Sequence, residues 1–299
     1  MGFATGKILA GVLLLAAPLA YYAQGPAGQT GGRGAFGGSG RGGRGRGISV
    51  TPPPMADFND HTGFVQIFDG ATLNGWDGDP NVWKVENGAI VGHSPAEKPV
   101  GTTFIIWRGG EPADFDLKAE VKAEGAGANT GIQYRSKNEV PTFGRGGGAR
   151  GASGAGRAGG AGAGRGTPPD PRWQIAGYQA DFDYVNRYSG QLMDSSNARF
   201  ILTPRGTVVV SEEGQPAKTL AYLGDYSELA GYVKINDWNQ YEVIARGNTL
   251  THIVNGHVMS ITIDNDTKLR ALKGLIALQI EGNGGVTISY RNLWLKTLH

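Results

Sequence analysis

The last quarter of the chain alternates apolar and polar residues over several short segments, and this constrains the fold more than any other feature. Residues 238–246 alternate and are followed by a Gly247-Asn248 turn; residues 250–254 alternate and are followed by an Asn255-Gly256 turn. A period of two is typical of strands with one buried face, and such dipeptides favour tight hairpin turns. The pattern predicts an antiparallel β domain.

The same alternation recurs upstream, with a further hairpin turn at Asn87-Gly88. No segment has the length and period of an amphipathic crossover helix, so parallel βαβ units are not expected. We predict an all-β fold, a two-sheet antiparallel jelly-roll sandwich. The other expected strands span residues 82–86, 89–92, 104–107, 115–123, 130–136, 173–182, 207–210, 257–263, 274–280 and 286–296, with a helical turn at 225–231.

The N-terminus has the pattern of a secretory signal. Lys7 precedes an apolar run at residues 8–20, and small residues follow. We predict a signal peptide over residues 1–23 and export to the periplasm or beyond. An uncleaved anchor is the alternative, although the run is shorter than the about 20 apolar residues that cross a bilayer. The chain contains no cysteine, which excludes disulfides and a thiol nucleophile.

Two tracts of glycine and arginine interrupt the pattern. The first belongs to a low-complexity linker at residues 24–56; the second is an insert at residues 144–166 within the β-sandwich domain at 57–299. Both have too little apolar surface to offset the entropy of ordering, so we expect them to be disordered. They carry eight arginines. Without these and Lys7, the rest has 19 basic against 26 acidic residues, a net charge of −7.

Arginine-glycine repeats can bind RNA by charge and stacking, but Phe36 is the only aromatic residue in either tract. With export also predicted, no nucleic-acid partner is expected. Association with anionic polymers of the cell surface stays open.

Nine short motifs occur in the order typical of one family. They stand at residues 75–76 (GW), 83–88 (WKVENG), 114–120 (DFDLKAE), 129–135 (NTGIQYR), 177–181 (GYQAD), 238–243 (WNQYEV), 255–256 (NG), 278–279 (LQ) and 290–292 (YRN). Together they resemble the 3-keto-disaccharide hydrolase family over about residues 64–298. The resemblance implies a concanavalin A-like jelly roll that cleaves glycosides already oxidised at the sugar 3-position, and hence a carbohydrate substrate.

The chain departs from the family pattern at two places. Gln179 and Asp181 stand where many members have Glu and Gln, and no histidine accompanies Gln279 and Glu281 as it often does in the family. A non-catalytic carbohydrate-binding module on the same fold is therefore the alternative function.

Strand parity indicates where a site would lie. In the four strands that carry the central motifs, the polar residues fall on the face opposite the apolar set. That face is either a binding groove or a solvated sheet surface with cross-strand ion pairs, and periodicity alone does not choose between them. The residues concerned are Glu120, Gln133, Arg135, Gln179, Asp181, Gln279 and Glu281.

A ketone at C3 makes the C2 proton acidic, so a base can remove it and the C1 substituent can leave. The candidate catalytic carboxyl groups are Glu120 or Asp181 as base and Glu281 as acid, with Arg135 or a divalent metal stabilising the enolate. Direct hydrolysis by paired carboxyl groups is the other route. The cofactor stays unknown because the five histidines show no metal-ligand spacing. The expected substrate-binding residues are Arg135, Gln179, Gln133, Gln279 and Trp107.

Overall fold

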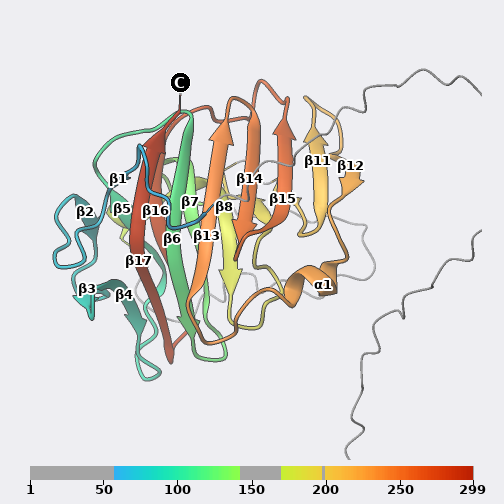
Figure 1. The fold of residues 1–299 in the computed structure, drawn as a ribbon. Coiled ribbons are helices and arrows are strands. Elements are labelled where there is room, and N and C mark those ends of the chain that lie inside the picture. The colour runs from blue at the N-terminus through green and yellow to red at the C-terminus, as the bar shows by residue number, and fades with distance from the viewer. Residues whose placement is uncertain (1–56, 142–169, 197–198, 299) are drawn as a thin grey trace, which may run out of the picture. The chain divides into compact units, whose positions relative to one another are not determined.

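Alternating apolar residues build two β-sheets that pack face to face (Figure 1). The computed structural model describes residues 57–141, 170–196 and 199–298. Sheet A has ten strands and sheet B has seven. The fold class predicted from the sequence is confirmed, since almost every strand pair is antiparallel. One pair, between β11 and β15, is parallel.

Sheet A runs in the order β12 (Lys218–Tyr222), β11 (Thr207–Ser211), β15 (His257–Asp264), β14 (Thr249–Val254), β13 (Asn239–Arg246), β6 (Phe115–Glu124), β17 (Val286–Thr297), β4 (Ala89–Ser94) and β3 (Trp83–Glu86), with β1 (Val65–Gln66) beside β17. Sheet B runs in the order β10 (Phe200–Thr203), β9 (Leu192–Asp194), β8 (Ala176–Asp183), β7 (Asn129–Lys137), β16 (Leu275–Gly282), β5 (Gly101–Trp107) and β2 (Trp76–Gly78).

The two helical elements are short. The helix α1 (Tyr226–Ala230) lies within the helical turn expected at 225–231, and the Asp225 side chain caps its N-terminus. The 3₁₀ turn η1 (Pro171–Trp173) replaces the beginning of the strand expected at 173–182. In the described ranges no helix has the length and apolar character needed to cross a membrane. The predicted signal peptide, the linker at 24–56 and the insert at 144–166 lie outside the described residues.

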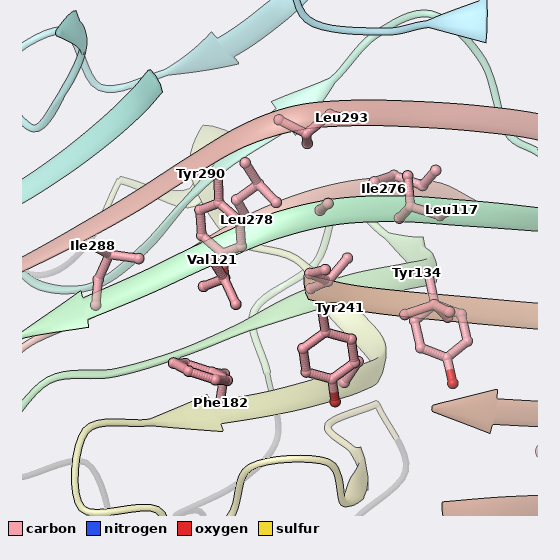
Figure 2. Packing of buried hydrophobic residues seen from close by; sticks show 14 of the residues in the cluster. Leu117, Val121, Tyr134, Phe182, Tyr241, Ile276, Leu278, Ile288, Tyr290 and Leu293 are labelled. Atoms are coloured by element: carbon pink, nitrogen blue, oxygen red, sulfur yellow. The ribbon is translucent and has the colours of Figure 1, made fainter. Parts of the chain in front are cut away.

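The core lies between the sheets and fixes which face of each strand points outward (Figure 2). Leu117 and Val121 of β6 come from sheet A, and Leu278 of β16 and Phe182 of β8 come from sheet B. Buried tyrosines bring hydroxyl groups into this core, and each is hydrogen-bonded, as Tyr134 is to His252 Nε2 at 2.9 Å. The residues between these positions therefore point away from the core, on the outer face of their own sheet.

Candidate functional site

The outer face of sheet B carries a connected set of carboxyl and amide side chains. Tyr178, Ala180 and Phe182 of β8 face the core, so Gln179 and Asp181 face outward. The same parity on β7 and β16 brings further polar residues to this face. We call this set the acid–amide cluster; it consists of Gln133, Gln179, Asp181, Gln191, Gln279, Glu281 and Asn129.

Strand register explains how the cluster assembles around the central strand β7. Gln133 lies opposite Gln179, and Gly131 lies opposite Asp181. Gly131 has no side chain, and a Cβ there would lie only 2.6 Å from Cγ of Gln179. The Gln179 side chain therefore crosses β7 at Gly131 and reaches Gln279 on β16.

A chain of hydrogen bonds links the amides to Asp181. Gln133 Nε2 donates to Gln179 Oε1 at 2.6 Å, and Gln179 Nε2 donates to Asp181 Oδ1 at 2.6 Å and to Gln279 Oε1 at 3.0 Å. Gln191 Nε2 donates to the other oxygen, Asp181 Oδ2, at 2.7 Å. Among the described residues no acceptor takes a hydrogen bond from Gln279 Nε2, so this donor is available to a ligand.

Asp181 holds its proton far more tightly than an ordinary aspartate. Its side chain is buried, and burial raises the pKa of Asp181 to about 7 because the charged form loses its hydration. The hydrogen bonds from Gln191 and Gln179 lower this pKa, while the charges of Asp183 and Glu281 raise it. The result is a carboxyl group that changes protonation near neutral pH.

Glu281 is the second acid of the cluster, and it is only partly buried. Burial raises its pKa, while hydrogen bonds from Asn129 and Asn283 lower it. The Asn129 side-chain amide donates to Glu281 Oε2 at 2.5 Å. Glu281 and Asp181 lie on β16 and β8, which flank β7. Asp181 lies opposite Gly131, and the register places Glu281 level with Asn129, two residues further along β7, so the two backbones are about 12 Å apart. Two carboxyl groups with raised pKa on one face are typical of acid–base sites.

A small apolar cluster borders the acid–amide cluster on the same face. Phe104 and Ile106 of β5 and Ala277 of β16 pack with Ile175, which follows η1. Phe104 lies opposite Gln279 in the register of β5 and β16. This apolar cluster therefore borders the Gln279 side of the acid–amide cluster, whereas Asp181 lies on β8, on the far side of β16 and β7.

Glu120 does not belong to this site. Its neighbours Ala119 and Val121 on β6 face the core from sheet A, so Glu120 lies on the outer face of sheet A, on the other side of the sandwich. There it accepts hydrogen bonds from Arg291 Nε at 2.7 Å and from Asn292 Nδ2 at 2.6 Å. The expectation that Glu120 shares a groove with Asp181 is corrected accordingly.

Arg135 also lies apart from the cluster. It sits at a register irregularity of β7 with φ of +46°, so its side chain does not continue the alternation from Gln133. The buried guanidinium is used in structural contacts: it donates to the carbonyl oxygens of Ala113, Gly247 and Ala271 and to Asp114 Oδ1. A role in stabilising an enolate is not compatible with these contacts.

Trp107 lies on the opposite side of sheet B from the cluster. Its side chain is partly buried and packs against the core between the two sheets. Gln133 and Gln179 are on the expected face, but their exposed fractions are 0% and 2%. Gln279 is nearly as buried, at 4%, and differs from these two in that its Nε2 donates to no acceptor among the described residues.

Two members of the cluster were not singled out as site residues in the sequence. Gln191 lies just before β9, a three-residue strand with too short a pattern to predict. Asn129 is the first residue of β7. Its position at the start of the NTGIQYR motif is the one signal that marks it. Within the described ranges no group of three or more His, Asp or Glu side chains is arranged to hold a metal ion.

Residues 63–296 match the model of a family described as 3-keto-alpha-glucoside-1,2-lyase-like domain. No curated protein matches the chain.

Three solved structures show how distant the structural likeness is. A candidate glycosyl hydrolase from Parabacteroides distasonis ATCC 8503 shares 14% identity over 79% of this chain and 99% of that one, with a TM-score of 0.45. The carbohydrate binding module CBM66 from Bacillus subtilis shares 12% sequence identity over 74% of this chain and 95% of that one, with a TM-score of 0.43. A protein of unknown function with a galectin-like fold from Bacillus subtilis shares 10% sequence identity over 75% of this chain and 90% of that one, also with a TM-score of 0.43.

Proposed function

The chain belongs to the 3-keto-alpha-glucoside-1,2-lyase-like family, and we propose that it cleaves the glycosidic bond of sugars that already carry a ketone at C3. The acid–amide cluster is the proposed active site. The observation that carries the proposal is that Asp181 and Glu281, two carboxyl groups with raised pKa, share one face, and that Gln279 on that face has an unused donor.

The chemistry of such a sugar requires a base, an acid and a donor to an oxyanion. The base removes the C2 proton, and the electron pair forms an enolate with the C3 carbonyl. The enolate then expels the C1 oxygen, leaving a C1=C2 double bond, and the departing oxygen takes a proton from the acid. Water adds across the double bond to give the free 3-keto sugar.

We assign these roles to three residues. Asp181 takes the C2 proton, because its two amide donors stabilise and orient the ionised form. Glu281, the more exposed carboxyl group, protonates the departing oxygen. Gln279 Nε2 donates to the C3 oxygen as negative charge develops there.

A carbohydrate-binding module without turnover is the second candidate. It is favoured by the near-complete burial of Gln133 and Gln179, whose side chains hydrogen-bond within the cluster and face no solvent. It is also favoured by the lack of the histidine that many family members carry near Gln279.

The test uses a 3-keto-α-glucoside with a chromogenic leaving group and its unoxidised counterpart. We expect the full-length protein to cleave only the first. Asp181→Asn and Glu281→Gln should each lower kcat/KM by about 100-fold or more, as loss of an acid–base group does. Glu120→Gln is the matched control and should act as wild type.

Wild-type rates in both Asp181→Asn and Glu281→Gln would refute the assignment. Saturable binding of an unoxidised glycan without turnover of any 3-keto sugar would decide for the binding module.

We also propose export of this enzyme, on the sequence of residues 1–23, with the arginine-glycine tracts as surface tethers at most. Cell fractionation tests export.

Deleting residues 144–166 should leave turnover of the 3-keto probe near normal. Loss of turnover in that variant would instead favour a function carried by the tract.

A further inference from the structure

A hollow lies at the β12 edge of sheet A. Its volume is about 440 Å³, and it is lined by residues 205–207, Tyr222 and residues 224–226. These residues come from the turn before β11 and the first residue of that strand, from the end of β12, and from the connection to α1 and its first residue. The hollow is open to solvent and is large enough to take one small ring-shaped molecule. The acid–amide cluster, by contrast, lies on the outer face of sheet B.

Two exposed tyrosines and two glycines are among the residues that line it. Tyr222 is 81% exposed and Tyr226 is 46% exposed. Gly206 and Gly224 approach so closely that a Cβ on Gly206 would lie 2.9 Å from the Gly224 oxygen, and Leu223 N donates to Gly206 O at 2.8 Å. A Cβ on either glycine would also contact the Leu229 side chain, at 3.5 Å from Gly206 and 3.4 Å from Gly224, so both positions lie against the packed base of α1.

Contacts with Arg205 and Arg187 fix the position of the Tyr226 ring. The Arg205 guanidinium carbon lies 4.2 Å from the ring centroid, and the tyrosine hydroxyl donates to the Arg187 carbonyl oxygen. Arg205 is 2% exposed and is itself fixed, because it donates to Asn186 Oδ1 at 2.8 Å and to Ser189 O at 2.9 Å. A ring that is ordered before binding loses little entropy when a ligand stacks on it.

The charges around the hollow select among ligands. Arg205 is covered by the Tyr226 ring, and its Nε is buried, so its charge does not face the space. Asp225 lines the hollow and is exposed; hydrogen bonds from Ser227 and Glu228 lower its pKa, which keeps it ionised at neutral pH. Its Oδ2 accepts no hydrogen bond from the described residues and can accept one from a hydroxyl group.

We propose that this hollow binds a neutral pyranose residue of a glycan, with Tyr222 and Tyr226 as stacking surfaces and Asp225 as acceptor. A pyranose has an apolar face of C–H groups, which suits an aromatic ring, and a rim of hydroxyl donors, which suits a carboxylate. The negative charge of Asp225 disfavours acidic sugars. This site is separate from the proposed active site and does not depend on it.

The test measures binding of neutral oligosaccharides by calorimetry and saturation-transfer NMR on the full-length protein. The panel contains gluco-, manno-, galacto- and xylo-configured tetrasaccharides at millimolar concentrations, with trigalacturonic acid as the acidic probe. We expect at least one neutral probe to bind. Tyr222→Ala and Tyr226→Ala should each weaken that binding about tenfold, the loss expected for one aromatic contact.

The controls separate stacking from folding and from catalysis. Tyr226→Phe keeps the ring and its contact with Arg205 but loses the hydroxyl bond to Arg187, so it should bind more tightly than Tyr226→Ala. Tyr232→Ala removes an exposed tyrosine outside the hollow and should bind as wild type. Tyr222→Ala should turn over a small 3-keto-glucoside unchanged, whereas Asp181→Asn should bind the neutral probe unchanged.

Three results would overturn the proposal. These are no binding of any neutral probe to the wild type, unchanged binding in both alanine variants, and tighter binding of trigalacturonic acid than of the neutral probes through the same two tyrosines.

Discussion

Gln191 donates its side-chain amide to Asp181 Oδ2 at 2.7 Å, from the loop that precedes β9. Gln179 occupies the other carboxylate oxygen from the strand of Asp181 itself. The ionised form of Asp181 is thus hydrogen-bonded at both oxygens, while burial acts in the opposite direction and dominates. The balance between these two effects sets the pH at which Asp181 can act as a base.

Replacing Gln191 by alanine should therefore raise the pKa of Asp181 further, because a donor to the charged form is lost. If Asp181 is the base, the acidic limb of the kcat/KM profile should move to higher pH by about one unit, as loss of one charge-assisted hydrogen bond implies. The pH profile with the 3-keto probe measures this. Gln174→Ala removes another buried glutamine that bonds to Thr102 O, and its profile should match wild type. An unmoved limb in Gln191→Ala would contradict the role of Asp181.

The raised pKa of Asp181 also makes stability depend on pH. The pKa is about 7 in the folded protein and 3.8 for an unperturbed aspartate. Between these values the unfolded chain has released this proton and the folded chain has kept it, so the group contributes a stability that falls as pH rises, and the loss is complete above about pH 7. Asp181→Asn should flatten the decline in the free energy of unfolding between pH 5 and pH 8, measured by urea denaturation.

Asp116 provides the matched control for that measurement. It lies on the outer face of sheet A, where burial and the charge of Glu242 raise its pKa to about 7. Asp116→Asn should flatten the same decline without reducing turnover of the 3-keto probe, whereas Asp181→Asn should do both. A decline as steep as wild type in Asp181→Asn would mean that its carboxyl group is ionised in the folded protein at pH 5.

The parity of strands predicted the outer-face location of Gln179, Asp181, Gln279 and Glu281, because alternation is a local property of each strand. It did not reveal that Glu120 lies on the other sheet. Sheet membership follows from pairing with distant strands, and β6 pairs with β13 and β17. Short-range patterns contain no information on such pairing. The alternation therefore placed seven polar residues in one group, although Glu120 and Arg135 lie away from the other five.

For the fold as well, the sequence predicted the features that depend on neighbouring residues, such as tight turns. Hairpins such as β3–β4 and β13–β14 were expected from Asn-Gly and Gly-Asn turns, which act through φ at single residues. The strand β12 was missed because all five of its residues are exposed, which leaves no alternation of burial to detect. The parallel pairing of β11 with β15 depends on contacts far apart in the sequence.

The bulge at Arg135 gives a prediction about stability. This residue is 1% exposed, and its guanidinium holds three carbonyl oxygens and Asp114. Arg135→Ala leaves buried acceptors without partners and should lower the free energy of unfolding by about 2–4 kcal/mol. Arg135→Lys should recover little, because one ammonium cannot reproduce the planar set of donors. Urea denaturation at pH 7 measures both.

Arg108 is the control for Arg135. It makes an exposed ion pair with Asp77, with side-chain exposures of 38% and 47%. Arg108→Ala should cost less than about 1 kcal/mol, as exposed pairs usually do. If Arg135→Ala costs no more than Arg108→Ala, the buried contacts of Arg135 are not structural.

The Gln179 side chain passes over Gly131 of β7. Its φ is not positive, so alanine is tolerated by the backbone, but the added Cβ would lie 2.6 Å from Gln179 Cγ. Gly131→Ala should displace Gln179 from Asp181 and Gln279, lower kcat/KM about tenfold and cost about 1–3 kcal/mol of stability through overpacking. Gly127→Ala, where the added Cβ would lie 4.0 Å from Cγ1 of Val286, should behave as wild type.

A double variant separates this clash from any other effect at Gly131. Gln179→Ala removes the atoms that the new Cβ would meet, so Gly131→Ala should cost much less stability in that background than in the wild type. Urea denaturation of the four proteins gives the coupling free energy. If the costs of the two substitutions simply add, Gln179 does not cross β7 at Gly131, and the hydrogen-bond path from Gln133 to Asp181 would have to be drawn differently.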